Sequence, residues 1–342
     1  MQLDTVRDIK QEWLSRVRPS DLDPDPDPGS SRRARAGAGD HVRPGVRVPA
    51  VGPVALGAAP AGSGYALAVR YRHDGPLVAR LVERLREEVG DGEIDVRGIG
   101  AVRALTSPLR GPVGPPTPGQ LQGRLRPLVP GCSICHGADT AGTLGAVVRR
   151  GQEQLLLTNA HVIARSGLAS VGDAVLQPGP ADGGTAADRV GSLDGWAPLG
   201  ADTANTVDAA LARLDEGIEV DTTGAPTTTA ELDGDELVEK LGRTTGFTSG
   251  RVTAIEVDDV VVDYGEVGLL RFDGQVEVAG TGGAFSRGGD SGSLVRLADG
   301  GAAVGLLFAG SERGGPDGTG LTFCNDISTV LDALGVVLLD QG

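Results

Sequence analysis

The sequence predicts a mainly β fold with an α/β extension at its N-terminal end. Between about residues 140 and 336, short apolar runs such as LGAVV, QLLLTNA and AVGLLFAG are separated by turns rich in Gly and Asp. This pattern is typical of an all-β barrel or sandwich. The 342 residues include 55 glycines, which suit many tight turns. Residues 64–98 instead predict a strand, a helix and a second strand.

Changes in composition divide the chain into five parts. Apolar residues recur at helical spacing over 1–18 and predict an amphipathic helix. Residues 19–45 are rich in Pro, Gly and charge and predict a flexible linker. We expect a small α/β domain over 46–106, a Pro/Gly-rich connector over 107–130 and the main β domain over 131–342. The helix either docks a protein partner or folds back on the body, and the sequence leaves both open.

Charge and hydropathy exclude several classes of partner. The net charge of −15 argues against nucleic acid, because phosphate binding needs a basic face. The uncharged stretch 48–69 is mostly Ala and Gly with three prolines, so we expect no membrane span. The start of the chain lacks the apolar core of a secretory signal. We therefore expect a cytoplasmic protein, and its Ala, Gly, Arg and Asp bias is typical of bacteria with high GC content.

The segment Cys132-Ser133-Ile134-Cys135-His136 matches the C-x-x-C-H pattern of covalent haem attachment. Haem attachment requires export and an axial ligand, yet the only methionine is Met1. Structural zinc sites normally use two separated ligand pairs, and these ligands crowd together. We expect no cofactor and no metal; a redox or haem protein is the alternative, and a Soret band would reveal it.

Three separate stretches supply residues for nucleophilic catalysis. In FSRGGDSGSLV, glycines flank Ser291, and the N–H groups of Gly289 and Ser291 are candidates for an oxyanion hole. In LLLTNAHVIA, His161 follows an apolar strand. A serine hydroxyl is a poor nucleophile until an imidazole accepts its proton.

The imidazole in turn needs a carboxylate that fixes its tautomer. Asp208 opens the alternating strand in NTVDAALARL and is the preferred candidate. Asp202 is a nearby alternative and Asp215 a weaker one. The chain order His161, Asp208, Ser291 across two groups of short strands matches one known arrangement of this chemistry.

The motifs TNAHV, VDAAL and GGDSGS resemble those of the trypsin-like (chymotrypsin-fold) serine proteases, over roughly residues 130–336. TAGTLGAVV, GRTTGFTSGRV and FSRGGDSGSL are similar to a narrower set, the intracellular bacterial trypsin-like proteins related to the narrow-leaf-type proteases of plants. The resemblance implies a double six-stranded β-barrel with the site between the barrels. His161 would act as general base and then general acid, Asp208 would orient it, and Ser291 would form the acyl-enzyme.

The same resemblance implies a primary substrate pocket. Phe285, six residues before Ser291, would form its floor. Phe308 and Ala309 replace the polar and bulky residues expected before Gly310 on the strand that pairs with substrate, and Gly310 and Gly320 would form walls. Such a pocket favours a small or apolar side chain and does not recognise Arg or Lys by charge.

The expected function is a serine endopeptidase acting on protein or peptide substrates, in a bacterial signalling or defence system. Secreted relatives pair a freed N-terminus with the Asp before the serine, but this chain shows no obvious cleavage-and-insertion sequence. We therefore expect Asp290 to serve the turn in a constitutively built site. The alternatives are a catalytically silent peptide-binding scaffold and a protease whose N-terminal region plugs the cleft. A protein partner for the helix and the α/β domain is a further expectation.

Overall fold

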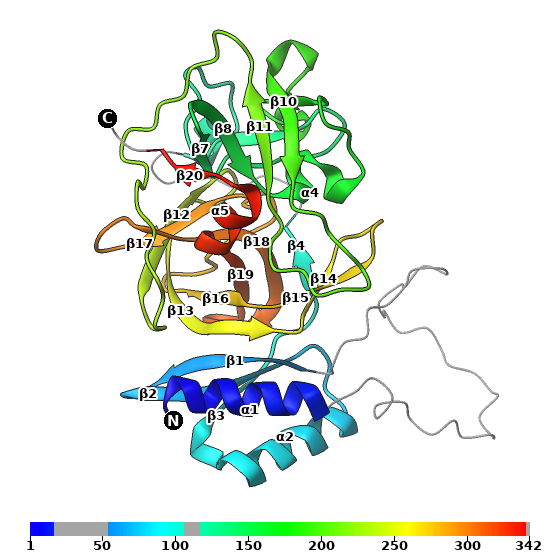
Figure 1. Ribbon diagram of the computed structural model, residues 1–342, viewed down its shortest axis with the longest axis vertical. Helices are drawn as coiled ribbons and strands as arrows, with labels where there is room; N and C mark the ends of the chain where they lie inside the picture. The colour runs from blue at the N-terminus through cyan, green and yellow to red at the C-terminus, as the bar shows by residue number, and fades with distance from the viewer. Residues whose placement is uncertain (17–53, 106–116, 340–342) are drawn as a thin grey trace, which may run out of the picture.

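The computed structural model describes residues 1–16, 54–105 and 117–339. The predicted linker over 19–45 lies outside the described residues, as does the first part of the predicted connector. The prediction of a mainly β fold, with a double-barrel core and an α/β extension, is confirmed (Figure 1). Within the described part of the chain, no helix is both long and apolar enough to cross a membrane.

The second barrel closes as a ring of six strands. Each strand pairs antiparallel with its two neighbours, and the last pair, β18 with β19, completes the ring. Inward-facing Val252, Val278, Val295 and Leu307 form its buried core. In ring order the strands are β12 (Leu237–Gly242), β13 (Gly246–Asp258), β16 (Gln275–Gly280), β19 (Gly320–Asp326), β18 (Ala303–Gly314) and β17 (Leu294–Leu297).

The first barrel is a half-barrel rather than a closed ring. No pairing among the described residues joins its edge strands β20 and β6, so the six-stranded closure implied by the resemblance is reached only in the second barrel. Helix α5 (Ile327–Leu334) runs from the second barrel back to the first. In sheet order the strands are β20 (Val337–Leu338), β7 (Ala146–Arg150), β8 (Glu153–Thr158), β11 (Ala210–Leu214), β10 (Arg189–Trp196), β9 (Ala174–Leu176), β5 (Ser133–His136) and β6 (Gly142–Thr143).

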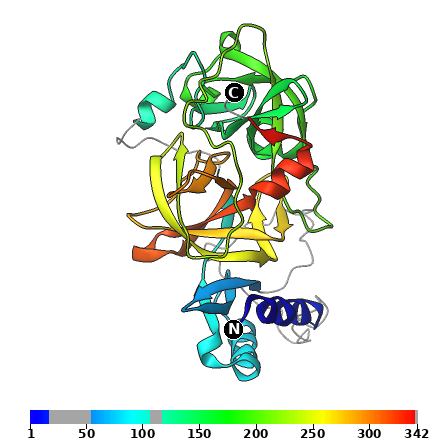
Figure 2. The same ribbon diagram turned by 60° about the vertical axis from the view of Figure 1, so that its left-hand side comes forward.

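The N-terminal extension lies at the end of the second barrel away from the first barrel (Figure 2). Strands β2 (Gly64–Tyr71) and β3 (Ile94–Gly98) pair in parallel, and α2 (Pro76–Val89) connects them. Pro76 opens this helix and buried Leu81, Val82 and Leu85 hold it on the sheet. Strand β1 (Val54–Ala61), which the sequence analysis did not predict, pairs with both β2 and β13. The sheet of the extension therefore continues into the second barrel.

Helix α1 (Leu3–Arg16) packs back on the extension, with Val6 and Trp13 buried. Its Lys10 ammonium lies 2.8 Å from the Asp258 carboxylate at the end of β13. The structure thus takes the second of the two arrangements that the sequence left open for this helix. The same apolar face that was a candidate for docking a partner is used inside the chain.

The extension ends in β4 (Val102–Ala104), which lies between β14 (Val260–Asp263) and β18. β4 is antiparallel to β18, with Ala104 opposite Ala309, and parallel to β14. β14 forms a hairpin with β15 (Leu269–Phe272). Two short helices, α3 (Pro118–Leu121) and α4 (Ala160–Ile163), complete the described α-helices. β4 lies near the junction of the two barrels (Figure 1), and the carbonyl of Leu105, which follows it, lies 3.1 Å from Ser291 Oγ.

Candidate active site

His161 and Asp208 are in contact at the ends of two neighbouring strands of the half-barrel. β8 ends at Thr158 and α4 begins at Ala160, so His161 follows the strand directly, while Asp208 precedes β11, the neighbour of β8. The imidazole Nδ1 lies 2.5 Å from Oδ2 of Asp208, and the His161 N–H donates to Oδ1 at 3.1 Å. The carboxylate therefore fixes Nδ1 as the protonated ring nitrogen and leaves Nε2 as an acceptor.

Asp208 is fully buried and has several polar partners. The Tyr264 hydroxyl donates to Oδ2 at 2.7 Å, and the Asp208 N–H donates to Oδ1 of Asn325 at 2.8 Å. Burial raises the pKa of Asp208, but the attraction of His161 and the hydrogen bonds from His161 and Tyr264 outweigh it, so the pKa is lowered. The carboxylate is thus ionised and held in place. Sequence analysis missed Tyr264, which follows β14 and carries no motif.

The other ring nitrogen of His161, Nε2, differs from Nδ1 in its surroundings. Nε2 is buried and has no hydrogen-bond partner within the described residues. An unpaired buried acceptor costs roughly 1–3 kcal/mol, so it favours any arrangement that brings a proton donor to it.

Thr158 at the end of β8 lies close to Gly292, the residue after Ser291. A Cβ on Gly292 would lie only 2.2 Å from the Thr158 Oγ1. The histidine and serine segments are therefore packed directly together.

Ser291 lies in a tight turn between β16 and β17. Gly289 and Gly292 on either side of it have φ values of +95° and +94°, which strongly favour glycine. The N–H of Thr143, in β6 of the half-barrel, donates to the Ser291 carbonyl at 2.8 Å. The two glycines predicted from the GGDSGS motif thus have a conformational reason to be there.

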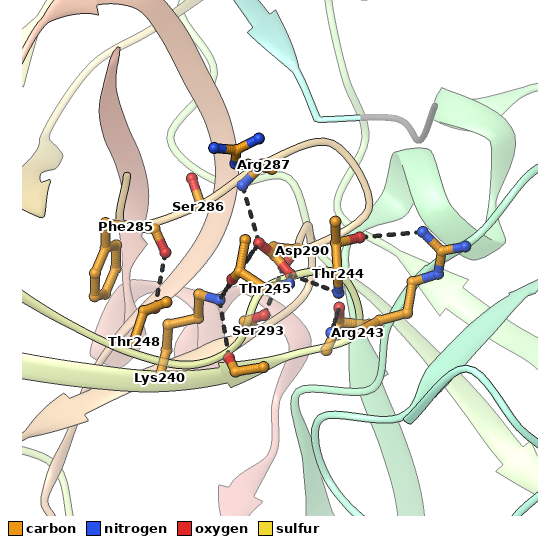
Figure 3. A network of polar contacts seen from close by, with 12 residues as sticks. Lys240, Arg243, Thr244, Thr245, Thr248, Phe285, Ser286, Arg287, Asp290 and Ser293 are labelled. Atoms are coloured by element: carbon orange, nitrogen blue, oxygen red, sulfur yellow. Dashed lines mark hydrogen bonds and ion pairs between the residues drawn. The ribbon is translucent and has the colours of Figure 1, made fainter. Parts of the chain in front are cut away.

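Asp290 anchors this turn through a network of polar contacts to its carboxylate (Figure 3). Its Oδ1 accepts the N–H groups of Thr244 and Thr245, and its Oδ2 accepts the Arg287 N–H and the Thr245 hydroxyl. The Lys240 ammonium on β12 lies 3.4 Å from Oδ2, and both side chains are fully buried. Burial lowers the pKa of Lys240, and the Asp290 carboxylate partly offsets this. An internal lysine thus supplies the positive charge beside Asp290, a partner that sequence analysis missed.

One carbonyl oxygen receives the donors of this turn. The Gly289 N–H donates to the Leu105 carbonyl at 2.9 Å, and the Ser291 Oγ lies 3.1 Å from the same oxygen. Ser291 Oγ also lies 3.2 Å from the Phe308 carbonyl. The predicted oxyanion donor Gly289 and the Ser291 hydroxyl therefore converge on a single peptide carbonyl.

The predicted pocket residues take different positions. Gly310 faces Leu105, since a Cβ on Gly310 would lie 3.0 Å from its Cδ2. Phe285 is buried within the core of the second barrel. The Phe308 ring is buried against the Phe272 ring, with the centroids 4.8 Å apart and the planes tilted by 45°, and its carbonyl lies 3.2 Å from Ser291 Oγ.

The remaining two predicted pocket residues lie along β18 and β19. Ala309 is buried and pairs with Ala104 of β4. Gly320 pairs with Gly314, farther along the hairpin, and the residue opposite Gly310 is Thr322. The Thr322 hydroxyl lies 2.6 Å from the Ser286 hydroxyl, so a polar pair that was not predicted stands near the pocket.

The alternative carboxylates and the cysteine segment lie elsewhere. Asp215 pairs with Arg189 at 2.9 Å, and Asp202 is exposed. Cys132 and Cys135 are buried next to and within β5, and burial raises the pKa of Cys132 to about 12. Among the described residues, no group of three or more His, Cys, Asp or Glu side chains is arranged to hold a metal ion. A cavity of about 860 Å³ beside α3 contains none of His161, Asp208 and Ser291 in its lining.

Comparisons with known proteins add the following. No protein-family model matches the chain, and no curated protein sequence matches it. Among solved structures, Thermobifida fusca protease A is 21% identical, with a TM-score of 0.44, over 62% of this chain and 98% of its own. A glutamic-acid-specific serine protease with a histidine triad in substrate binding is 24% identical, with a TM-score of 0.45, over 62% and 100%. A Nocardiopsis protease is 18% identical, with a TM-score of 0.44, over 62% and 99%. Identities and TM-scores this low give no information about the activity of this chain.

Proposed function

We propose that the chain is a serine endopeptidase that hydrolyses peptide bonds through an acyl-enzyme. The observation that carries this proposal is the 2.5 Å contact between His161 Nδ1 and Asp208 Oδ2, beside a serine whose turn directs donors at a carbonyl oxygen. Histidine alone or a Gly-rich turn alone is common. An imidazole oriented by a buried carboxylate next to such a turn is the arrangement that nucleophilic acyl transfer needs.

Each group has one task in this mechanism. His161 Nε2 accepts the proton of Ser291 as its Oγ attacks the substrate carbonyl, and Asp208 stabilises the imidazolium that forms. The N–H groups of Gly289 and Ser291 hold the negative oxygen of the tetrahedral intermediate, a contribution worth about 10²–10³ in rate for one donor. His161 then gives the proton to the leaving amine, and a water hydrolyses the ester by the reverse sequence. Tyr264 and Lys240 act as positioning residues, on Asp208 and on the Asp290 turn respectively.

A fluorophosphonate probe tests this proposal, because it reacts only with a serine whose base and oxyanion hole are assembled. The full chain is labelled alongside Leu105→Asp, which weakens the hold of β4 on the cleft, and Ser291→Ala serves as the control. The proposal is supported if the wild type or Leu105→Asp is labelled at Ser291, and if Ser291→Ala and denatured protein are not labelled. If neither the wild type nor Leu105→Asp is labelled, the proposal is wrong and a catalytically silent peptide-binding scaffold is favoured.

The biological setting is proposed from the sequence alone. The composition and the motif similarity favour a cytoplasmic bacterial enzyme of a signalling or defence system, related to the narrow-leaf-type proteases. A protein partner would bind the N-terminal extension on surfaces other than the buried face of α1. Fractionation of the source cells and capture of partners by the Ser291→Ala protein would test these proposals.

A further inference from the structure

The segment that ends in Leu105 lies along β18 and against the serine turn, as the acyl side of a substrate would. β4 adds to the edge of β18, the strand expected to pair with substrate backbone, with Arg103 opposite Gly310 and Ala104 opposite Ala309. The Leu105 N–H continues this pairing and donates to the Phe308 carbonyl at 3.2 Å. An extended peptide that adds a strand in this way gains main-chain hydrogen bonds along its whole length.

The carbonyl of Leu105 occupies the place of the reacting carbonyl. It accepts the Gly289 N–H at 2.9 Å and lies 3.1 Å from the Ser291 Oγ. The proposed mechanism assigns these same two groups to the oxyanion and the nucleophile. A carbonyl that only filled space in the cleft would not need to meet both.

The side chain of Leu105 takes the place of the residue that determines specificity. It packs over Gly310, where the added Cβ would lie 3.0 Å from Cδ2 of the leucine, and against the apolar core of the second barrel. A side chain on Gly310 would close this space. The pocket is thus filled by a branched apolar residue of medium size.

We propose that the chain is its own substrate and that Ser291 cleaves the peptide bond that follows Leu105. This inference rests on the proposed function. Ser291 Oγ attacks the Leu105 carbonyl carbon, the bond from this carbon to the next nitrogen breaks, and the proton passes through His161 Nε2 to the leaving amine. Water then hydrolyses the Leu105 ester, which leaves a carboxylate on Leu105 and a free amine on the next residue.

The Ser291 hydroxyl is directed away from the proposed base in the uncut chain. Its single proton points at carbonyl oxygens, whereas His161 Nε2 is without a partner in the described part of the chain. Self-cleavage therefore requires the Ser291 hydroxyl to leave these carbonyls and donate to Nε2, which would satisfy that buried acceptor.

Two consequences follow for activity towards other proteins. β4 blocks the cleft while it is bound, so cleavage of other substrates follows the cut and the release of this strand. The pocket that holds Leu105 also selects leucine at the same position of external substrates. The contacts of the uncut chain thus predict a preference for leucine before the cleaved bond and self-cleavage before the cleavage of other proteins.

The test compares the full-length wild type with Ser291→Ala and Leu105→Asp. Leu168→Asp is the matched control, because Leu168 is a leucine of the half-barrel with 60% exposure, so a charge there stays in water. Intact mass and N-terminal sequencing are expected to show a new N-terminus at Thr106 in the wild type and in Leu168→Asp. Ser291→Ala should stay intact, and Leu105→Asp should be cut at least about tenfold more slowly, because a charge enters an apolar pocket. The rate should not depend on protein concentration, since each chain cuts the strand in its own cleft.

A parallel assay separates failure of this inference from failure of the proposed function. The same proteins receive the fluorophosphonate probe and a peptide of residues 101–108, AVRALTSP. Labelling of Ser291, or cleavage of the peptide after its leucine, by a chain that itself stays intact would leave the endopeptidase standing and overturn self-cleavage. A cut in the chain that persists in Ser291→Ala, or that maps elsewhere than after Leu105, would also overturn it. Absence of labelling and of every cut would overturn both.

Discussion

The Lys240 ammonium lies 3.4 Å from the carboxylate of Asp290, the residue directly before Ser291, and both side chains are fully buried. The ion pair joins β12 to the turn that carries Gly289 and Ser291. Because the charges are shielded from water, neither can lose its partner without a large cost. This relationship holds the proposed oxyanion hole in shape without a free N-terminus beside Asp290.

Lys240→Met should therefore destabilise the protein by about 3–5 kcal/mol, because it leaves the Asp290 carboxylate buried without its cation. We expect fluorophosphonate labelling to slow by more than the loss of folded protein explains, as the turn loosens. Thermal unfolding and labelling rate measure the two effects. The double variant Lys240→Met/Asp290→Asn should recover part of the stability; a single variant as stable and as reactive as wild type would contradict the role.

Tyr264→Phe removes the hydroxyl that donates to Oδ2 of Asp208 at 2.7 Å and keeps the ring that stacks on Phe272. Hydrogen bonds to charged groups contribute about 1.5–3 kcal/mol, so we expect a loss of that order in stability and a roughly tenfold fall in kcat with KM little changed. Kinetics on a leucine-containing peptide measure both constants. A change confined to KM would place Tyr264 in substrate binding instead of in the orientation of Asp208.

Gly310→Val fills the space that the Leu105 side chain occupies. Even a Cβ at this position would lie 3.0 Å from its Cδ2, so cleavage after leucine should fall by at least about a hundredfold. Labelling of Ser291 by a small fluorophosphonate should persist, since the catalytic groups are unchanged. Gly300→Val is the control, because a Cβ there would meet no atom within 4 Å. Equal loss of labelling and cleavage would show general damage to the fold.

Asp259→Asn should stabilise the protein near neutral pH. Burial raises the pKa of Asp259 to about 6, while Arg271 opposes this and nearby Asp273 adds to it. With the folded pKa above the unfolded value, the folded state binds more protons between about pH 4 and 6, so stability falls as pH rises through this window. Removing the charge should therefore give a gain of roughly 1–2 kcal/mol above pH 6 that disappears below pH 4.

Denaturant unfolding across that pH range checks this prediction. Asparagine also tolerates the φ of +61° at this position. Asp317→Asn is a matched control, because Asp317 has a similar φ of +54° and is exposed. A gain that is the same at every pH, or that the control shares, would show that the backbone and not the charge is responsible.

Several elements of the fold could be predicted because their signals are local. The helix α2 follows from Pro76, the spacing of Leu81 and Leu85, and the Gly90 that ends it. Strands such as β7, β8 and β18 follow from short apolar runs between turns rich in Gly and Asp. By contrast, β1 was read only as an uncharged Ala/Gly stretch. Ala, Gly and Pro have low strand propensity, so its hairpin with β2 was missed, and its pairing with β13, about two hundred residues away, leaves no local trace.

The candidate site also combines residues with local sequence signals and residues without them. The residue types and order of His161, Asp208 and Ser291 are visible in their motifs, and the structure places the His161 imidazole and the Asp208 carboxylate in contact. Tyr264 and Lys240 could not be predicted, because neither lies in a motif and each acts through a carboxylate distant in sequence. The family resemblance placed Gly320 in a pocket wall, but the register of β18 and β19 brings Thr322 opposite Gly310.

The sequence by itself determined the strand-rich composition, the glycine turn around Ser291 and the set of groups available for acyl transfer, because these depend on neighbouring residues. Only the tertiary structure decided which part of the chain lies against Ser291. The path of the chain from β3 through β4 brings Leu105 to Ser291, although 186 positions separate them, and places its carbonyl on the Gly289 N–H. No local preference encodes such a contact, because it arises from the packing of the whole extension against the second barrel.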